Sequence, residues 1–412
     1  MATIKPFECL RPNEQVAHRV AALPYDVYDR EEAKAKVAED ELTFLRIDRA
    51  ETQFPDSVDT YDPIVYRKAK ELLEARIADG TFITDSDRCY YIYELIMNGR
   101  HQTGIVACAS IDDYAGNVIK KHENTREEKE IDRINHVDTC NAQTGPIFLA
   151  YRSDEIISGV VERYKTTTKP IYAFTADDGI IHNVWKIDQK QDINTIENEF
   201  SHINSIYIAD GHHRAASAVR VGFKRRAESG LFRGNEEFNF FLSVLFPEDQ
   251  LMIMPYNRVV KDLNGYSVDS FIKEISKNFT VTKMDGPYTP EAKCTFGMFV
   301  EDTWYKLEAN DTLKKLSDPV SSLDVSILQD YLLGPVLSIN DPRKDKRIDF
   351  IGGIRGLKEL ERRVHHDMKI AFAMYPTSIR ELFAVSDAGR LMPPKSTWFE
   401  PKLRSGLFIH RI

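Results

Sequence analysis

The sequence has few cysteines and no long apolar run, and each shortage narrows the class of protein. Its five cysteines are odd in number and widely spaced, at Cys9, Cys89, Cys108, Cys140 and Cys294. This pattern argues against a disulfide framework or a zinc knuckle. No stretch reaches the roughly 18 apolar residues that a membrane span requires. The charged start, Met1 to Arg11, does not resemble a signal peptide. We therefore expect a cytoplasmic protein with no membrane partner.

An excess of positive charge is also missing. The formal net charge is -9 and the pI is near 5.7, so no global positive field favours nucleic acid. The sequence contains no basic helix-turn-helix segment either. We expect no nucleic-acid partner, and any site for an anion must be local.

The chain is long enough for two regions. Its 412 residues exceed a typical single core. Hydrophobic content of 42% with 29% charged residues is ordinary for a folded protein. We expect an N-terminal α/β region over residues 1–250 and a C-terminal α/β region over residues 251–412.

Local patterns predict a mixture of helices and strands. Asp62 and Pro63 form an N-cap and first-turn pair before a helical apolar stripe that ends at Gly80. Asn98-Gly99 joins two β-rich runs and predicts a hairpin. Further helices are expected at 154–165, 190–203, 268–277, 323–333, 355–365 and 378–386, and further strands at 146–151, 239–246, 251–254, 295–300, 304–307 and 370–374. Prolines break the first sixty residues, which predicts strands and loops there rather than long helices.

The most informative motif is Tyr-Ile-Ala-Asp-Gly-His-His-Arg, from Tyr207 to Arg214. Its apolar start reads as a buried strand, and the alanines after Arg214 continue as a helix face. The polar residues therefore lie at a helix N-terminus, where free N–H groups and the helix dipole favour an anion. Gly211 permits close approach, and Arg214 is suited to grip a phosphate.

Three side chains of the same motif carry candidate catalytic roles. Asp210 is a candidate Mg²⁺ ligand, and His212 and His213 are candidate proton or hydrogen-bond donors to a phosphoryl oxygen. The same pattern is also typical of an N-capped turn with a solvated histidine pair.

A second polar cluster runs from Lys120 to His136. Here Glu123 lies before a predicted helix, with His122 and Thr125 beside it, and is a candidate general base for a hydroxyl nucleophile. On the helix, Arg133 shares a face with Lys129, Asp132 and His136. This face is suited to a polar substrate, although a solvated, salt-bridged helix is the ordinary interpretation. Ile131, Ile134 and Val137 supply a helical apolar stripe in the same segment.

Three shorter motifs complete the candidates. Lys395, Ser396 and Thr397 carry groups that pair with phosphate oxygens, but no Walker A glycine loop precedes them. A polyproline stretch that packs Trp398 on the core is an equal alternative. Tyr25 and Asp26 follow a proline, in a turn that suits a ligand-facing role and a purely structural role equally. Arg258 is a candidate second phosphate clamp.

Together these motifs resemble a bacterial and archaeal family known as domain of unknown function 1015. The resemblance runs nearly end to end. Its residues are Ile4 to Phe7 with Leu10 to Pro12, Pro24 to Val27, His122 to Thr125 with Asp132 and Arg133, Ala209 to Arg214, Pro255 to Arg258, and Met392 to Thr397 with Pro401, Lys402 and Ser405 to Leu407.

The turn from Asp210 to Arg214 also resembles the phosphate-binding turn of the ParB and sulfiredoxin fold. Free-serine kinases of that fold pair an Asp-Gly-x-x-Arg turn with a glutamate base. The resemblance implies a mixed α+β protein with a ParB/sulfiredoxin-like nucleotide-binding core, elaborated by additional sheet and helices.

The leading functional hypothesis is a phosphotransferase that uses Mg²⁺ and ATP or ADP on free serine or phosphoserine. A phosphoserine phosphatase-type hydrolase and a non-catalytic ParB-like nucleotide-binding module remain alternatives. In the leading hypothesis the Pro-Lys-Ser-Thr motif packs on the same site as the Asp-Gly-His-His-Arg motif. A homodimer is compatible with this hypothesis.

Overall fold

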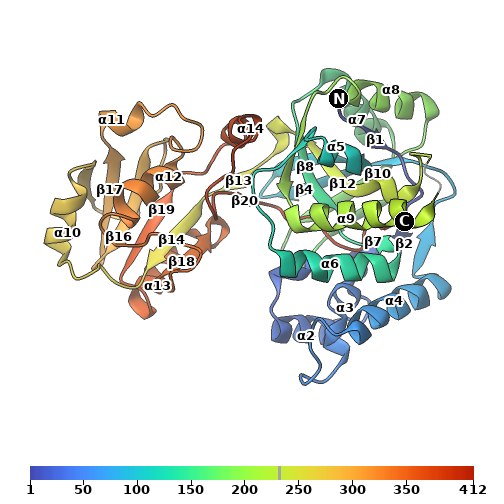
Figure 1. The fold of residues 1–412 in the computed structure, drawn as a ribbon, viewed down its shortest axis with the longest axis horizontal. Helices are drawn as coiled ribbons and strands as arrows, with labels where there is room; N and C mark the ends of the chain where they lie inside the picture. The colour runs from blue at the N-terminus through green and yellow to red at the C-terminus, as the bar shows by residue number, and fades with distance from the viewer. Residues whose placement is uncertain (231–232) are drawn as a thin grey trace. The chain divides into compact units, whose positions relative to one another are not determined.

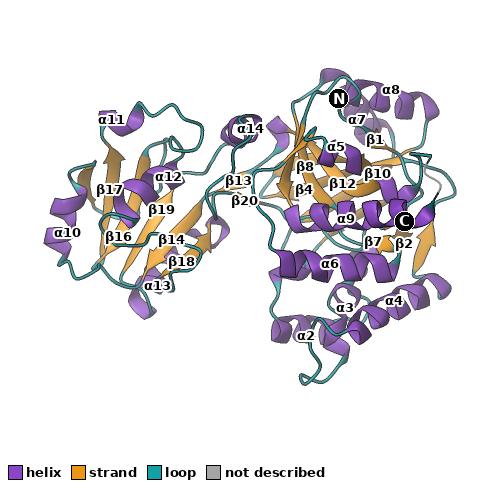
Figure 2. Ribbon diagram, in the orientation of Figure 1, coloured by secondary structure: helices purple, strands orange, loops and turns teal. Residues whose placement is uncertain are grey.

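The chain is a mixed α/β protein with several sheets. The computed structural model describes residues 1–230 and 233–412 (Figure 1). They form two compact units: unit 1 comprises Met1–Leu251 and Pro401–Ile412, and unit 2 comprises Met252–Glu400. Figure 2 shows that helices and sheet strands occur in both units. Among the described residues, no helix combines the length and the apolar character needed to cross a membrane.

The last segment of the chain belongs to unit 1, whereas the expected boundary after residue 250 assigned it to the C-terminal region. Backbone hydrogen bonds explain the difference. Ala22 and Ser405 exchange N–H to carbonyl bonds of 3.2 and 2.8 Å, and Leu10 and Ile409 exchange bonds of 3.0 and 2.9 Å. These pairings span almost the whole sequence, so local patterns cannot predict them.

Unit 1 contains a nine-stranded mixed sheet. Its strands run in the order β6 (Ile119–Lys120), β11 (Ile206–Asp210), β8 (Ile147–Tyr151), β12 (Phe240–Pro247), β5 (Arg100–Ser110), β4 (Tyr90–Met97), β10 (Ile181–Ile187) and β9 (Tyr172–Thr175), with β1 (Ile4–Lys5) also on β5. The pairs β11–β6 and β12–β8 are parallel, and the others are antiparallel.

The predicted hairpin is confirmed as β4 and β5. Met97 pairs with Arg100, and Asn98 and Gly99 both have positive φ, of 52° and 76°. Two successive residues with positive φ are what the tight turns of hairpins require.

Helices of unit 1 cover the sheet and build the core. Apolar residues of α7 (Glu155–Thr167), α8 (Lys190–Phe200) and α9 (His212–Ser229) share one buried cluster with the strands. α6 (Glu127–Cys140) lies alongside α9, and α4 (Pro63–Ala78) packs on α6 (Figure 1). The Asp62 and Pro63 start of α4 is confirmed, since the Asp62 side chain accepts a hydrogen bond from the Ile64 N–H.

The first sixty residues contain no long helix, as their prolines predict, but they include short helices that were not predicted. Strand β2 (Leu10–Pro12) pairs with β3 (Phe82–Thr84), but three helices follow: α1 (Ala17–Val20), α2 (Arg30–Glu39) and α3 (Leu45–Asp48). Helix α2 begins with a capping box in which Asp29 and Glu32 each accept a backbone hydrogen bond from the other residue. Only Ala33 and Val37 of α2 are buried, so its apolar pattern is faint.

Unit 2 contains a six-stranded antiparallel sheet. The strand order is β15 (Phe279–Met284), β17 (Thr303–Ala309), β16 (Thr295–Val300), β19 (Ile370–Met374), β14 (Tyr256–Val260) and β18 (Ile348–Gly352). Its helices are α10 (Val268–Ile275), α11 (Asp311–Lys314), α12 (Asp324–Leu328), α13 (Gly356–His366) and α14 (Ile379–Asp387). The long helix expected at 323–333 is α12, continued by a π-helical turn at Gln329–Leu333.

Candidate functional site

The motif from Tyr207 to Arg214 forms a strand, a one-residue turn and a helix. β11 ends at Asp210, and α9 begins at His212. Between them, Gly211 has φ +94°, a left-handed conformation that glycine adopts without strain. A Cβ at this position would lie 3.1 to 3.3 Å from the Arg214 guanidinium, which therefore covers the turn closely.

Both carboxylate oxygens of Asp210 accept hydrogen bonds. Oδ1 accepts from the Gly211 N–H at 2.8 Å, and Oδ2 accepts from Lys402 Nζ at 2.9 Å. Burial raises the pKa of Asp210, but the positive charges of Lys402 and Arg214 outweigh that effect and hold the pKa below its usual value. Asp210 is therefore ionised at neutral pH.

Sequence reasoning missed Lys402 as a site residue. It follows Pro401 in the short C-terminal segment, and the only signal for it was its membership of the family motifs. Its ammonium adds a cation to the turn that Arg214 already lines. The turn thus carries two cations around one carboxylate.

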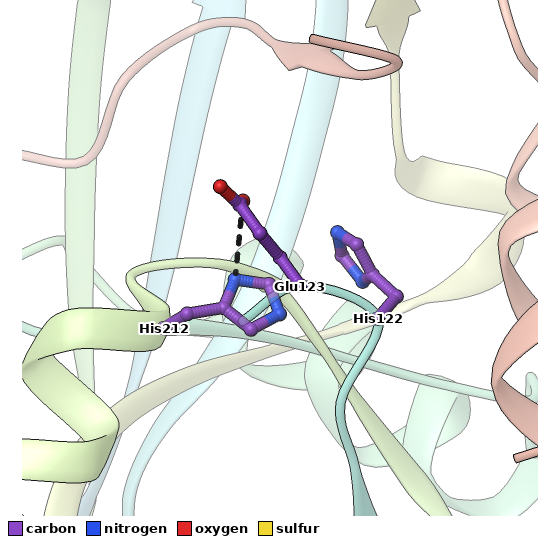
Figure 3. Close-up of side chains that lie close together, drawn as sticks. All are labelled: His122, Glu123 and His212. Atoms are coloured by element: carbon purple, nitrogen blue, oxygen red, sulfur yellow. Dashed lines mark ion pairs between the residues drawn. The ribbon is translucent and has the colours of Figure 1, made fainter. Parts of the chain in front are cut away.

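His122, Glu123 and His212 lie together beside the turn (Figure 3). His122 and Glu123 come from the segment between β6 and α6, and His212 is the first residue of α9. The two imidazole rings meet edge to face with centroids 4.4 Å apart. Glu123 Oε2 lies 4.0 Å from His212 Nδ1, and the Glu123 side chain is 60% exposed.

Both imidazoles of this group are neutral at pH 7. Burial lowers the pKa of His122 to about 4, although the charge of Asp210 opposes the effect. Burial, aided by the neighbouring His122, lowers the pKa of His212 well below its usual value. Neutral imidazoles keep a lone pair for an acceptor or ligand role.

The remaining residues of the two motifs are placed as follows. The Arg126 N–H donates to His213 Nε2 at 3.0 Å, and burial lowers the pKa of His213. The Thr125 hydroxyl donates to the Glu130 carboxylate. The bond to His213 joins the start of α6 to α9. The bond from Thr125 joins the segment before α6 to α6 itself.

The apolar stripe of α6 is only partly buried, since Ile134 and Val137 are half-buried. Ile131 is 47% exposed, while Asp132, Arg133 and His136 of the polar face are 8%, 7% and 3% exposed. This face is salt-bridged through Arg133 and Asp132, but it is not solvated as the ordinary interpretation expects, because only Lys129 of the four residues is exposed. Buried polar groups are retained where they are paired or where they serve a ligand.

Arg133 joins the α6 face to the turn at Tyr25. Its guanidinium carbon lies 4.0 Å from the centre of the Tyr25 ring, and its Nη2 pairs with Asp132 at 2.9 Å. Burial raises the pKa of Tyr25 to about 12, against the opposing charge of Arg133. Tyr25 is therefore a neutral phenol at pH 7.

Two adjoining cavities bring predicted substrate and phosphate residues together within unit 1. Tyr25, Arg133 and Arg214 line a narrow cavity of about 30 Å³, together with Asp48 and Ser405. A neighbouring cavity of about 210 Å³ is lined by residues of both charge signs: Asp26, Asp48, Arg49, Glu51, Lys129, Asp132 and Arg133, with Tyr25, Tyr28, Tyr61, Tyr66 and His136 among others. Arg214 Nη1 also donates to the Pro146 carbonyl at 2.6 Å.

The other predicted phosphate residues lie in unit 2. Arg258 on β14 is 4% exposed and donates to the backbone carbonyls of Tyr256 and Lys395, the latter at 3.0 Å. Lys395 Nζ lies 5.4 Å from the centre of the Tyr256 ring. Ser396 is buried, and Thr397 is half-buried.

Arg258 lines a cavity of about 420 Å³ within unit 2, with Phe350 and Arg343 also on its wall. Burial lowers the pKa of Arg258 to about 10, so the group stays charged at pH 7. No carboxylate pairs with it among the residues that the structure describes. A buried guanidinium with only carbonyl partners is suited to an anion in the cavity.

The oxygen and nitrogen donors of the site suit different metal ions. Asp210 supplies hard oxygen donors, which fit Mg²⁺, although both oxygens are engaged by Gly211 and Lys402. The two imidazoles beside it are poor ligands for Mg²⁺ and good ones for transition metals.

Comparison with curated proteins gives no significant match. Solved structures give distant similarities. SbnI with a C-terminal truncation, from Staphylococcus aureus, is 12% identical with a TM-score of 0.39, covering 73% of this chain and 85% of that one. A free serine kinase in complex with AMP is 13% identical with a TM-score of 0.35, covering 74% and 92%. A conserved hypothetical protein from Pyrococcus furiosus is 14% identical with a TM-score of 0.34, covering 74% and 94%.

The sequence itself carries a family assignment that spans most of the chain. The profile described as "Protein of unknown function (DUF1015)" matches residues 4–326. This range includes the Asp210 to Arg214 turn, the His122 to Thr125 segment and Arg258. The chain belongs to the DUF1015 family.

Proposed function

We propose that the protein is a nucleotide- and Mg²⁺-dependent phosphotransferase that acts on free serine or phosphoserine. The observation that carries the proposal is the turn between β11 and α9, where left-handed Gly211, Arg214 and Lys402 surround a helix N-terminus. Such a turn supplies N–H donors and two cations for phosphate oxygens. The substrate class comes from the resemblance of this turn to that of free-serine kinases, as does the ParB/sulfiredoxin-like core.

Phosphoryl transfer needs positioning and charge neutralisation more than covalent chemistry. In this proposal the first N–H groups of α9 and the guanidinium of Arg214 hold phosphate oxygens. Glu123 takes the proton of the attacking hydroxyl, since its carboxylate is exposed and reachable by a substrate. Buried His212 and half-buried His213 donate or accept hydrogen bonds at the same turn.

The cavity of about 210 Å³ is the proposed amino-acid site. Free serine carries an ammonium and a carboxylate, and the cavity wall offers partners for both. Arg133 and Lys129 suit the carboxylate, while Asp26 suits the ammonium. Tyr25 adds a neutral phenol at the junction with the narrow cavity that Arg214 lines.

Asp210 is the proposed Mg²⁺ ligand, and the ion would neutralise charge on the transferred phosphoryl group. Lys402 would then leave the carboxylate for a phosphate oxygen. In unit 2 we propose that Arg258, with Lys395, Ser396 and Thr397, binds nucleotide phosphates. Which of ATP and ADP takes part is set by the direction of transfer.

The test is turnover by the purified full chain with serine, Mg²⁺ and either ATP or ADP, and with phosphoserine and ADP. We expect phosphoserine to form from serine or to be consumed with ADP, and Asp210→Asn and Arg214→Ala to lose at least about a hundredfold in rate. His202→Asn, at an exposed position after α8, is the matched control and should keep full activity. Activity that survives both site variants would place the reaction elsewhere, and no turnover in either direction would refute the proposal.

A further inference from the structure

The group formed by His122, Glu123 and His212 has a chemistry that the proposed phosphotransferase does not use. Each residue offers one donor atom, and the three donor atoms lie within 4.8 Å of one another. Figure 3 shows the two rings and the carboxylate gathered around a common space. Two imidazoles and one carboxylate are a frequent set of protein ligands in metalloenzymes.

Unsatisfied polar atoms point to a missing ligand at this place. Nδ1 of His122 and Nε2 of His212 are buried and have no hydrogen-bond partner among the described residues. The two residues are only 2% and 5% exposed. Leaving a buried polar atom unpaired costs about 1 to 3 kcal/mol, so each ring has a nitrogen that lacks a partner. The His212 nitrogen that faces Glu123 Oε2, at 4.0 Å, is the other one, Nδ1.

We propose that His122, Glu123 and His212 bind a divalent transition-metal ion of the Zn²⁺ type. Nitrogen donors select such ions over Mg²⁺, which prefers oxygen and retains its waters. Ligands at about 2.1 Å from a tetrahedral ion lie about 3.4 Å apart, so the donors must close in by about 1.4 Å at most. Glu123 is mostly exposed, so a movement of its carboxylate does not require the buried core to shift.

The site resembles catalytic rather than structural metal sites in its openness. Three protein ligands leave a fourth position, and the exposed Glu123 side keeps it accessible to solvent. Asp210 lies close enough for its charge to raise the pKa of both imidazoles, so its negative charge also favours a cation there. The ion and a hydroxyl proton would compete for the Glu123 carboxylate.

This inference stands apart from the proposed reaction, because ion binding is measured with no substrate present. The probe is Co²⁺, added to untagged, chelator-treated full-length protein, with the visible absorption spectrum as the readout. All five cysteines are buried and free, so a cysteine-bound ion would be recognised by sulfur charge-transfer bands.

We expect one equivalent of Co²⁺ to give d–d bands typical of four- or five-coordination, and Zn²⁺ to displace it while millimolar Mg²⁺ does not. Glu123→Gln should weaken binding by at least about tenfold and His212→Asn by at least about a hundredfold. Glu123 is exposed, so its variant tests the site without risk to the core. His202→Asn is the matched control and should bind Co²⁺ as the unchanged protein does.

Three results would overturn the inference. They are the absence of stoichiometric Co²⁺ binding, equal affinity in Glu123→Gln and the unchanged protein, and displacement by Mg²⁺ at concentrations similar to Zn²⁺. Binding without turnover would leave this site standing and refute the phosphotransferase alone. Turnover without Co²⁺ binding would support the phosphotransferase and refute the metal site.

Discussion

Lys402 donates a hydrogen bond to Asp210 at 2.9 Å, although the two residues are 192 positions apart in the sequence. Asp210 is the last residue of β11, and Lys402 lies in the C-terminal segment of the chain that belongs to unit 1. The end of the chain therefore supplies a cation to the turn that the middle of the chain forms. The pair links the integrity of the turn to that last segment.

Replacing Lys402 with methionine should lower the free energy of unfolding at pH 7 by about 1 kcal/mol, because the pair is partly exposed. The folded-state pKa of Asp210 lies below its ordinary value of 3.8. The pair's contribution is therefore complete above that value and is lost as the pH falls through the folded-state pKa. Urea unfolding at pH 7 and near pH 2 measures the difference. Lys190→Met, at an exposed position, is the control, and an equal loss in both variants would contradict the assignment.

Gly211→Ala should damage the turn in two ways. The positive φ costs about 1 to 2 kcal/mol for a residue with a Cβ, and the new Cβ displaces the Arg214 guanidinium. Gly230→Ala is the matched control, since Gly230 also has positive φ but open space around its Cβ position. Both variants should lose stability, but only Gly211→Ala should lose affinity for inorganic phosphate, measured by calorimetry. Equal phosphate affinity in the two variants would show that Arg214 does not hold the anion.

Asp324, the first residue of α12, should make the protein less stable as the pH rises. Burial raises its pKa to about 7, although its oxygens accept hydrogen bonds from the Cys294 N–H at 2.9 and 3.1 Å. Between about pH 4 and 7 the folded state binds more protons than the unfolded state at this group, so stability falls with rising pH.

Asp324→Asn keeps an acceptor for the Cys294 N–H and removes the charge. It should raise the free energy of unfolding at pH 8 by roughly 4 kcal/mol and leave it nearly unchanged at pH 4. Urea unfolding at both pH values is the measurement, with Asp311→Asn at an exposed position of α11 as the control. A gain of the same size at pH 4 would exclude titration of Asp324 as the cause.

Arg258 should bind phosphate in the unit 2 cavity. In an Arg214→Ala background, which removes the contribution of the turn, saturating inorganic phosphate should raise Tm by about 2 to 4 °C. Adding Arg258→Met should abolish the rise. Arg362→Met is the control, because Arg362 is 58% exposed and already paired with Glu359. A rise that persists without Arg258 would assign the anion to another group.

Local signals predicted the parts of the fold that local chemistry controls. Asn98-Gly99 determines a tight turn by its backbone conformation, and Asp62 with Pro63 starts a helix by capping it. Helix α2 was not predicted, because its apolar pattern is faint. Strands β15 and β18 were not predicted either. Each lies at an edge of the sheet, where partly exposed residues obscure the apolar alternation.

In the candidate site, too, local sequence predicts some features and distant contacts determine the others. The turn around Gly211 was predictable because strand, glycine and helix are contiguous. Lys402 was not predictable by spacing, since its partner lies in a distant segment. The buried polar face of α6 was mistaken for a solvated one, because a charged stripe looks the same in sequence whether it faces water or a cavity. The adjacency of His122 and His212 likewise arises from tertiary packing.

The most direct test of the central claim is a ³¹P NMR time course of the full chain with phosphoserine, Mg²⁺ and ADP, and with serine, Mg²⁺ and ATP. We expect the phosphoserine and nucleotide signals to interconvert, and Arg214→Ala to stop the exchange. Release of inorganic phosphate alone would identify a hydrolase instead. Unchanged spectra in both mixtures would contradict phosphoryl transfer to or from serine.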